Sequence, residues 1–175
     1  MLMQHLNRKY YKGAFSLLSA NNTYPDTVAK VDENTIATAT LSGNTILVKL
    51  FSVNQTTGAT AQVASSIANV GSAVSEVVAI ECLTPSLFVI TFKKSSDGLS
   101  YMIAAKYDGS TFTFSANMSN QISDAMIANA VVVPLTATQF LLSYSNNGGR
   151  MHKVMTIVNT VITERFFVHR VIYMP

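Results

Sequence analysis

The sequence predicts an all-β protein built from repeated units, and three observations support this prediction. The segment Leu83–Phe92 matches Leu135–Tyr144 without a gap at a spacing of 52 residues, and the same step backwards reaches Val31–Thr40. Each copy contains short runs of apolar residues that are typical of strands, separated by turns rich in Gly, Asp, Asn and Ser. Charged residues make up only 12% of the chain. A repeat of this length is usually one supersecondary unit that buries its apolar face by stacking on its copies.

The second copy shows the expected pattern of four strands most clearly. Its first two strands are joined by the turn at Thr84–Ser86, and Asp97-Gly98 lies in the loop between the second and third strands. Asp-Gly pairs favour turns, because both residues tolerate a positive φ. A second Asp-Gly pair, at Asp108-Gly109, precedes the last strand. The strands expected in this copy are 77–83, 87–92, 101–107 and 111–114.

The other two copies repeat this order of strands and turns. In the third copy the strands are expected at 128–135, 139–144, 152–158 and 161–168. In the first copy they are expected at 27–31, 35–40, 45–53 and 59–63. Residues 64–74 form the one stretch where a short helix can be argued, and a β-type connector is the favoured alternative. Residues 1–23 resemble the back half of a further unit, since Tyr11–Leu17 is similar to Tyr107–Phe114 with one residue deleted.

These units predict a single repeat domain over residues 1–175. It consists of a half repeat at 1–23 and full repeats at 24–73, 74–125 and 126–175. Strand-dense copies of about 50 residues are typical of β-propeller blades, and closed propellers have four to eight blades. About three and a half blades cannot close a ring, so the sequence predicts that oligomerisation completes it. The alternative is a two-sheet β-sandwich in which the internal duplication is incidental.

The repeat resembles the β-propeller-like repeats of bacteriophage tail and virion proteins and of bacterial surface proteins. The residues that carry the resemblance are Val78–Phe92, a pair of strands around Leu-Thr-Pro-Ser, and Tyr107–Phe114, a hairpin around Asp-Gly-Ser-Thr. The resemblance covers residues 24–164. It implies a scaffold, an adhesin or a sugar-binding protein rather than an enzyme, and a location in a virion or outside the cell.

Patterns for catalysis, metals and cofactors are not found in the sequence, and we expect no enzymatic activity, no metal and no cofactor. The three histidines, His5, His152 and His169, are far apart, and the single cysteine, Cys82, cannot form an intramolecular disulfide. Zinc and calcium sites need closely spaced ligands. Apolar runs long enough for a transmembrane helix are also missing, so no membrane span is expected.

The loops that join the second and third strands of each copy are the candidate binding site. They should lie on one rim, where propellers usually bind ligands. Their polar residues and a tyrosine suit a glycan, whereas the alternative is that they are turn residues that bond their own backbone. The candidate residues are Asn44, Asp97, Tyr101, Asn146, Asn147 and Arg150.

The two ends of the chain are basic, although the formal net charge is only +3. Residues 1–20 and residues 150–175 carry +3 each, and the part between them carries −3. Such ends could contact an acidic partner, but they lack a nucleic-acid-binding motif, so nucleic acid is not the expected partner. The C-terminal strand is expected to contact another subunit through Arg165, Phe167, Arg170 and Tyr173.

Together these features predict a non-enzymatic structural or assembly subunit of a virion, either of a phage tail or capsid-associated, or of another extracellular multimer. Its partners are expected to be copies of itself or other structural subunits. The alternative is a small carbohydrate-binding, lectin-like propeller module for surface attachment.

Overall fold

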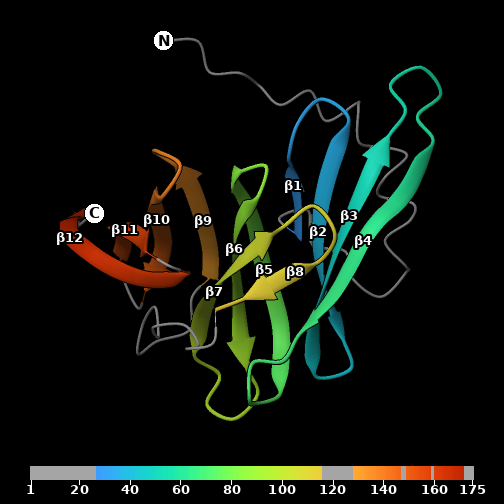
Figure 1. Cartoon of the computed structure of the whole chain (residues 1–175). Coiled ribbons are helices and arrows are strands. Elements are labelled where there is room, and N and C mark those ends of the chain that lie inside the picture. Colours follow the sequence, from blue (N-terminus) through green and yellow to red (C-terminus); the bar gives the residue numbers. More distant parts are fainter. Residues whose placement is uncertain (1–26, 116–127, 147–148, 159, 172–175) are drawn as a thin grey trace.

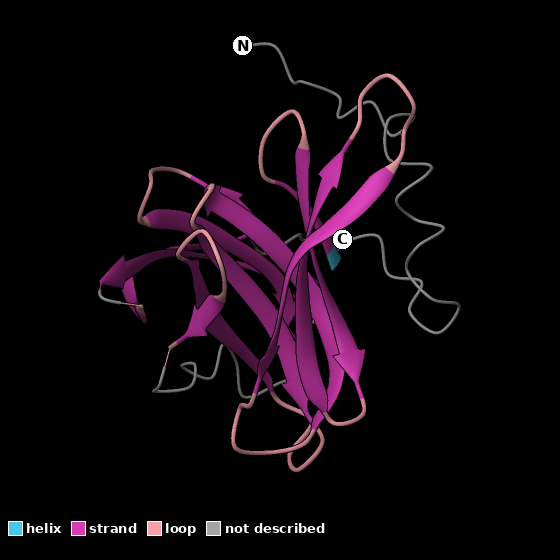
Figure 2. Ribbon diagram, turned by 45° about the vertical axis from the view of Figure 1, so that its right-hand side comes forward, coloured by secondary structure: helices cyan, strands magenta, loops and turns pink. Residues whose placement is uncertain are grey.

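The computed structural model describes residues 27–115, 128–146, 149–158 and 160–171, and it is all-β in these ranges (Figures 1 and 2). The half repeat expected at residues 1–23 lies outside the described residues. The strands form antiparallel four-stranded sheets in which each strand pairs with its neighbour along the chain. We call them the first sheet (β1–β4), the middle sheet (β5–β8) and the third sheet (β9–β12).

The first sheet falls within residues 24–73, the middle sheet within 74–125 and the third within 126–175. The strand bounds are β1 Val28–Lys30, β2 Thr35–Ser42, β3 Thr45–Val53, β4 Thr60–Ala68, β5 Val74–Thr84, β6 Leu87–Lys94, β7 Ser100–Tyr107, β8 Phe112–Phe114, β9 Ala128–Pro134, β10 Gln139–Asn146, β11 Gly149–Val158 and β12 Val161–Val171.

The described part of the chain therefore has three stacked sheets rather than the two of a β-sandwich. The middle sheet contributes to two separate apolar clusters, one shared with the first sheet and one shared with the third. In Figure 1 the first and third sheets lie at opposite ends, with the middle sheet between them. β5 contacts β1 and β2, and it also contacts β9, so the first strands of the sheets lie next to one another.

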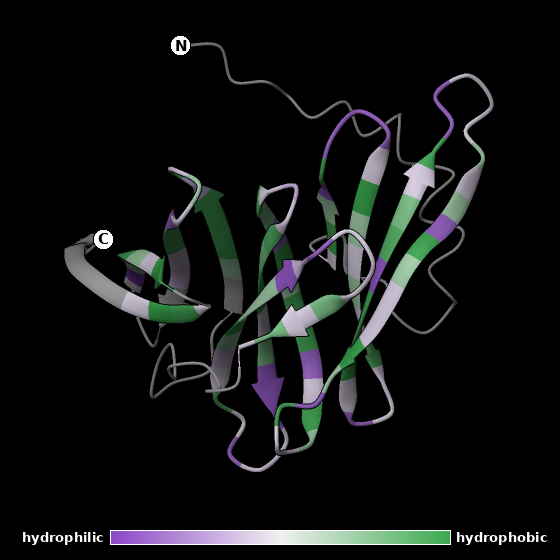
Figure 3. Cartoon of the chain, viewed as in Figure 1, coloured by the Kyte–Doolittle hydropathy of each residue, from purple (hydrophilic) through white to green (hydrophobic). Residues whose placement is uncertain are grey.

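Each sheet has two faces, which follow from the alternation of side chains along a strand. We call one of them the backward face; it carries Ile36, Phe88 and Phe140, which occupy the same repeat position in β2, β6 and β10. The opposite face, the forward face, carries their neighbours in sequence, Ala37, Val89 and Leu141. Figure 3 shows apolar residues along the strands and hydrophilic residues concentrated toward strand ends and turns.

The sheets stack in one repeated order, with a forward face against the next backward face. Ala37 of the first sheet shares a cluster with Phe88 of the middle sheet. Val89 of the middle sheet shares the other cluster with Phe140 of the third sheet. The same sheet-on-sheet contact is thus made twice, with equivalent residues on each side.

The sequence placed the inner strands well and the outer ones less well. Residues 64–74 do not form a helix: β4 continues to Ala68 because these residues pair with β3, from Ala64↔Leu50 to Ala68↔Ile46. β5 begins at Val74 rather than at 77, because shifts in register between Val74 and Ala79 add residues to the strand.

The β11–β12 turn offers a test of backbone strain at Thr160. Its φ is +67°, which a β-branched residue rarely adopts. We expect Thr160→Gly to raise the free energy of unfolding by about 1 kcal/mol, since glycine adopts this conformation without a steric penalty. Urea unfolding measures the change. Thr57→Gly is the matched control in a turn without positive φ at the threonine, and it should give no gain; an equal gain would contradict the strain argument.

Candidate functional site

Two of the loops expected on one rim do meet, through the connector between β4 and β5. The backbone N–H of Val74 donates to the carbonyl oxygen of Asn44 at 2.9 Å, and that of Ser95 donates to the carbonyl oxygen of Ala73 at 2.8 Å. The β2–β3 turn and the β6–β7 loop therefore lie at the same end of the stack, which is the lower edge in Figure 1. Gly43 takes a φ of +59° at the first position of the two-residue β2–β3 turn, as type II′ hairpins require.

Asp97 and Tyr101 form a compact polar cluster in this rim. Asp97 Oδ2 accepts a hydrogen bond of 2.9 Å from the Tyr101 hydroxyl, and Asp97 Oδ1 accepts one of 2.9 Å from the backbone N–H of Leu99. Lys94 Nζ lies 3.9 Å from the centroid of the Tyr101 ring, and Phe92 stacks on the same ring with centroids 6.0 Å apart. Both carboxylate oxygens and the ring are therefore engaged within the chain.

These contacts also set the protonation of the cluster. The bond from the Leu99 N–H is the largest cause of a lowered pKa at Asp97, with smaller contributions from the Tyr101 hydroxyl and the Lys94 charge. The pKa of Tyr101 is raised, chiefly by its hydrogen bond to Asp97. The pair thus stays as a carboxylate and a neutral phenol at neutral pH.

Polar residues in other turns also bond their own backbone. Asp108 Oδ1 accepts from the N–H groups of Ser110 and Thr111, both at 2.9 Å. Asn54 Oδ1 accepts from the N–H groups of Thr56 and Thr57 at 2.9 and 3.0 Å. This local bonding is the usual role of Asx residues in turns, and it is the role that the alternative interpretation gives to the rim residues.

The remaining candidate residues belong to the third repeat. Asn146 ends β10 and pairs with Gly149, and Arg150 is exposed in β11, while Asn147 lies outside the described residues. Residues 165, 167 and 170 of the expected subunit contact lie in β12, which pairs with β11 of its own chain; Tyr173 lies outside the described residues. Of the candidate rim residues, the structure thus joins Asp97 and Tyr101 by a hydrogen bond.

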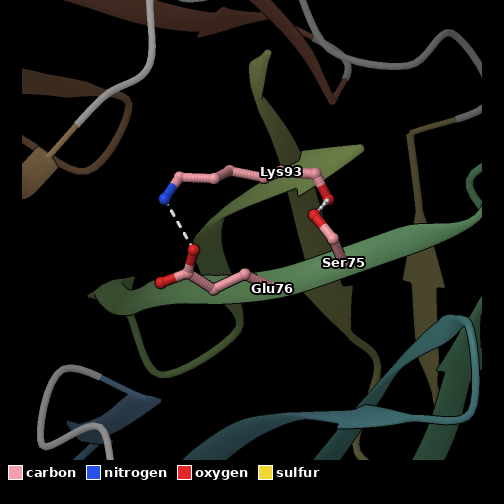
Figure 4. Close-up of polar contacts among 3 residues, drawn as sticks. All are labelled: Ser75, Glu76 and Lys93. Carbon is pink, nitrogen blue, oxygen red and sulfur yellow. Dashed lines mark hydrogen bonds and ion pairs between the residues drawn. The ribbon is translucent and has the colours of Figure 1, made fainter. Parts of the chain in front are cut away.

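An ion pair joins β5 and β6 near the end of the middle sheet. Lys93 Nζ lies 2.6 Å from Glu76 Oε2, and the Ser75 hydroxyl donates to the Lys93 carbonyl oxygen at 3.4 Å (Figure 4). Both charged side chains are partly buried, with exposed fractions of 16% and 29%. The ion pair links the two strands at the place where the register of β5 against β6 shifts.

Glu81 is a partly buried carboxyl group on the forward face of the middle sheet, and the sequence prediction missed it. It pairs with Val89, which belongs to the cluster shared with the third sheet. Burial raises the pKa of Glu81 to about 7, despite the opposing effect of a backbone hydrogen bond from Cys82. The repeat could have revealed it. Ala29 and Val133 occupy the position of Glu81 in the other sheets, are apolar, and pair with the residues equivalent to Val89.

The neighbouring thiol of Cys82 is held in its protonated form. Burial raises the pKa of Cys82 to about 11, with the charges of Glu81 and Asp32 acting in the same direction, and Sγ donates to the carbonyl oxygen of Thr84 at 3.0 Å. Since the thiolate is the nucleophile, Cys82 is unsuited to nucleophilic chemistry at neutral pH.

The end sheets carry the exposed apolar residues of the described chain. Large hydrophobic side chains that are more than a third exposed occur in the first and third sheets and their adjoining turns, and the middle sheet has none. They are Val63, Ile67, Val131, Val133, Leu135, Val158 and Val161. Exposed apolar residues that gather on one face of a sheet mark an interaction surface more often than an isolated exposed residue does.

The forward face of the third sheet is the clearest such surface. Leu141 pairs with Val133 in β9 and Val154 in β11, just as Val89 pairs with Glu81 and Ala104. Val89 and Ala104 are fully buried, whereas Leu141 and Val154 are partly exposed and Val133 is 43% exposed. The same register makes His152 equivalent to Met102, not to Ser100 as the 52-residue spacing suggests, because the β10–β11 loop is shorter.

Within the described ranges, groups of three or more His, Cys, Asp or Glu suited to hold a metal ion are not found. A search of the same residues finds no helix that is long and apolar enough to cross a membrane. The described chain thus offers turns, a rim cluster and sheet faces as its candidate sites. Comparison with known proteins yields no matching family model, no matching curated protein and no matching solved structure.

Proposed function

We propose that the protein is a non-enzymatic structural subunit, and that its sheets act as propeller blades that other subunits complete. The observation that carries the proposal is the forward face of the third sheet. Its residues Val131, Val133, Leu141 and Val154 belong to neither apolar cluster. The residues at the equivalent positions of the other sheets are buried against the next sheet, except Glu81, which is only partly buried. Apolar faces of this kind gain stability when another subunit removes them from water.

The kind of assembly that we propose is a virion, as part of a phage tail or associated with a capsid, or another extracellular multimer. The low share of charged residues, 12%, suits a surface that is largely covered by neighbours. The stacked sheets and the exposed apolar residues of the end sheets are features that suit a scaffold.

The native mass of the purified chain tests this proposal. Multi-angle light scattering over a range of protein concentrations should give a mass above that of one 18.9 kDa chain. Salt should affect the mass little, because an apolar contact is not screened as ion pairs are. A monomer that persists at the highest concentration would overturn the proposal.

The carbohydrate-binding alternative depends on the rim cluster of Asp97, Tyr101 and Lys94. It has less support, since the Tyr101 ring and both Asp97 oxygens are already in contact within the chain. A glycan array with the wild-type protein and Tyr101→Ala tests it. Binding that Tyr101→Ala abolishes would favour the lectin, and no binding to any glycan would leave the structural role.

A further inference from the structure

The middle sheet shows what a completed sheet of this protein looks like. Its forward face lies against the third sheet and its backward face lies against the first sheet. None of its large apolar side chains is strongly exposed. Among the described residues each end sheet makes one of these contacts, and no described sheet offers a backward face to the third sheet.

The first sheet carries a backward face that no other described sheet contacts. It is formed by Leu47, Lys49 and Phe51 of β3 and by the β4 residues opposite them, since Leu47 pairs with Ile67 and Lys49 with Ser65. Ile67 is 61% exposed and Val63, beside the shift in register, is 53% exposed.

Nearer to β1, the residues of this face are already buried. Ile36 and Thr38 are buried, with exposed fractions of 3% and 2%. The part that remains open to another subunit is therefore centred on β3 and β4, with Val63 and Ile67 as its most exposed apolar residues.

We propose that the partner is a second copy of this chain, bound head to tail, with the forward face of its third sheet on the β3–β4 part of the first sheet of the other copy. This inference rests on the proposed function and names the occupant of its surface. The chain already makes the same contact twice, between equivalent faces of successive sheets. A third use of this contact between copies needs no new kind of interface.

The number of copies follows from the number of sheets. Two copies with three described sheets each give six, which lies within the four to eight blades of closed propellers, whereas three copies give nine. Head-to-tail contacts form a closed ring when the rotation per subunit completes the circle. A twofold ring has two identical interfaces, each joining the third sheet of one copy to the first sheet of the other.

Two variants with opposite charges test the direction of this contact. Val131→Lys with Val133→Lys alters the forward face of the third sheet, and Val63→Glu with Ile67→Glu alters the backward face of the first sheet. All four side chains are at least 43% exposed, so the fold should tolerate the changes. Each variant alone should be monomeric, with self-association weakened at least about a hundredfold, because both interfaces would bury unpaired charges against apolar residues.

Mixing the two variants should restore a dimer. In the mixed dimer one interface contains two unaltered faces, and the other brings lysine against glutamate. The readout is native mass spectrometry of the mixture, with Ser96→Lys in the exposed β6–β7 loop as the control that should dimerise as the wild type does. Circular dichroism of each variant establishes that loss of the dimer is not loss of the fold.

Three outcomes would overturn the inference. A wild-type monomer would overturn it together with the proposed function. An oligomer that persists in the variant Val63→Glu with Ile67→Glu would overturn the head-to-tail contact alone. It would mean that the first sheet is not in the interface, as in a contact between two third sheets. Folded variants that do not combine on mixing would also overturn it, while the proposed structural role would stand.

Discussion

Replacing Phe88 by alanine is expected to lower the free energy of unfolding by about 3–5 kcal/mol, the range for truncating a buried aromatic side chain. Phe88 is fully buried between the first and middle sheets, and its ring meets Phe112 edge to face with centroids 5.6 Å apart. The variant loses both the transfer free energy of the ring and its packing against the alanines of the first sheet. Urea unfolding followed by circular dichroism measures the loss.

The repeat supplies a matched comparison for this variant. Phe140 occupies the equivalent position in the second interface and is also fully buried, so Phe140→Ala should cost about the same. Where alanine prevents folding, Phe88→Leu and Phe140→Leu give a smaller loss that can still be measured. A loss below about 1 kcal/mol for Phe88→Ala would contradict the stacking of the first two sheets.

The inner strands could be predicted because their apolar residues recur at one spacing. β6 and β10 carry Phe88 and Phe140 at the same repeat position, and the turns before and after them contain strong turn formers. β6 buries residues on both of its faces, which gives a continuous apolar run that is easily recognised. The prediction of an all-β fold with repeated four-stranded units is confirmed.

The edges of the sheets could not be predicted from local pattern. β4 contains Ala and Ser residues with little preference for a strand, and its pairing with β3 decides its conformation. The equivalence of His152 to Met102 depends on the length of the β10–β11 hairpin, which shifts the third strand against the repeat spacing. Such shifts become visible only when the pairing of the strands is known.

The candidate site could be predicted only in part, because it also depends on how the strands pair and the loops fold. That Asn44 and Asp97 belong to one rim follows from the meander order of strands, since equivalent turns lie at the same end of each sheet. The engagement of Asp97 by the Tyr101 hydroxyl depends on the conformation of one loop, which composition does not determine. The open forward face depends on which sheet is last in the stack, and the local sequence pattern does not determine that.

Replacing Glu81 by glutamine is expected to stabilise the protein at pH 8 by about 1–3 kcal/mol and to leave it unchanged at pH 4. The pKa of Glu81 is raised by burial from 4.5 to about 7 in the folded state. Between these values the folded chain binds more protons than the unfolded chain, so the stability of the wild type falls as pH rises through this window. A pKa difference of one between the folded and unfolded states corresponds to about 1.4 kcal/mol, and the partial exposure of Glu81 reduces the full effect.

The difference in the free energy of unfolding between the wild type and Glu81→Gln separates the effect of this carboxyl group from those of the others. Asp97 and Asp108 have lowered pKa values because backbone N–H groups bond them, so their contributions change only under more acidic conditions and are shared by both proteins. Urea unfolding at several pH values and one protein concentration measures this difference, which we call the gap. The gap should grow between about pH 4.5 and 7 and then stay constant. Glu33→Gln, at an exposed turn position, is the control and should show no gap. A gap of the same size at every pH would mean that glutamine acts through packing, and it would contradict a carboxyl held in its protonated form between the middle and third sheets.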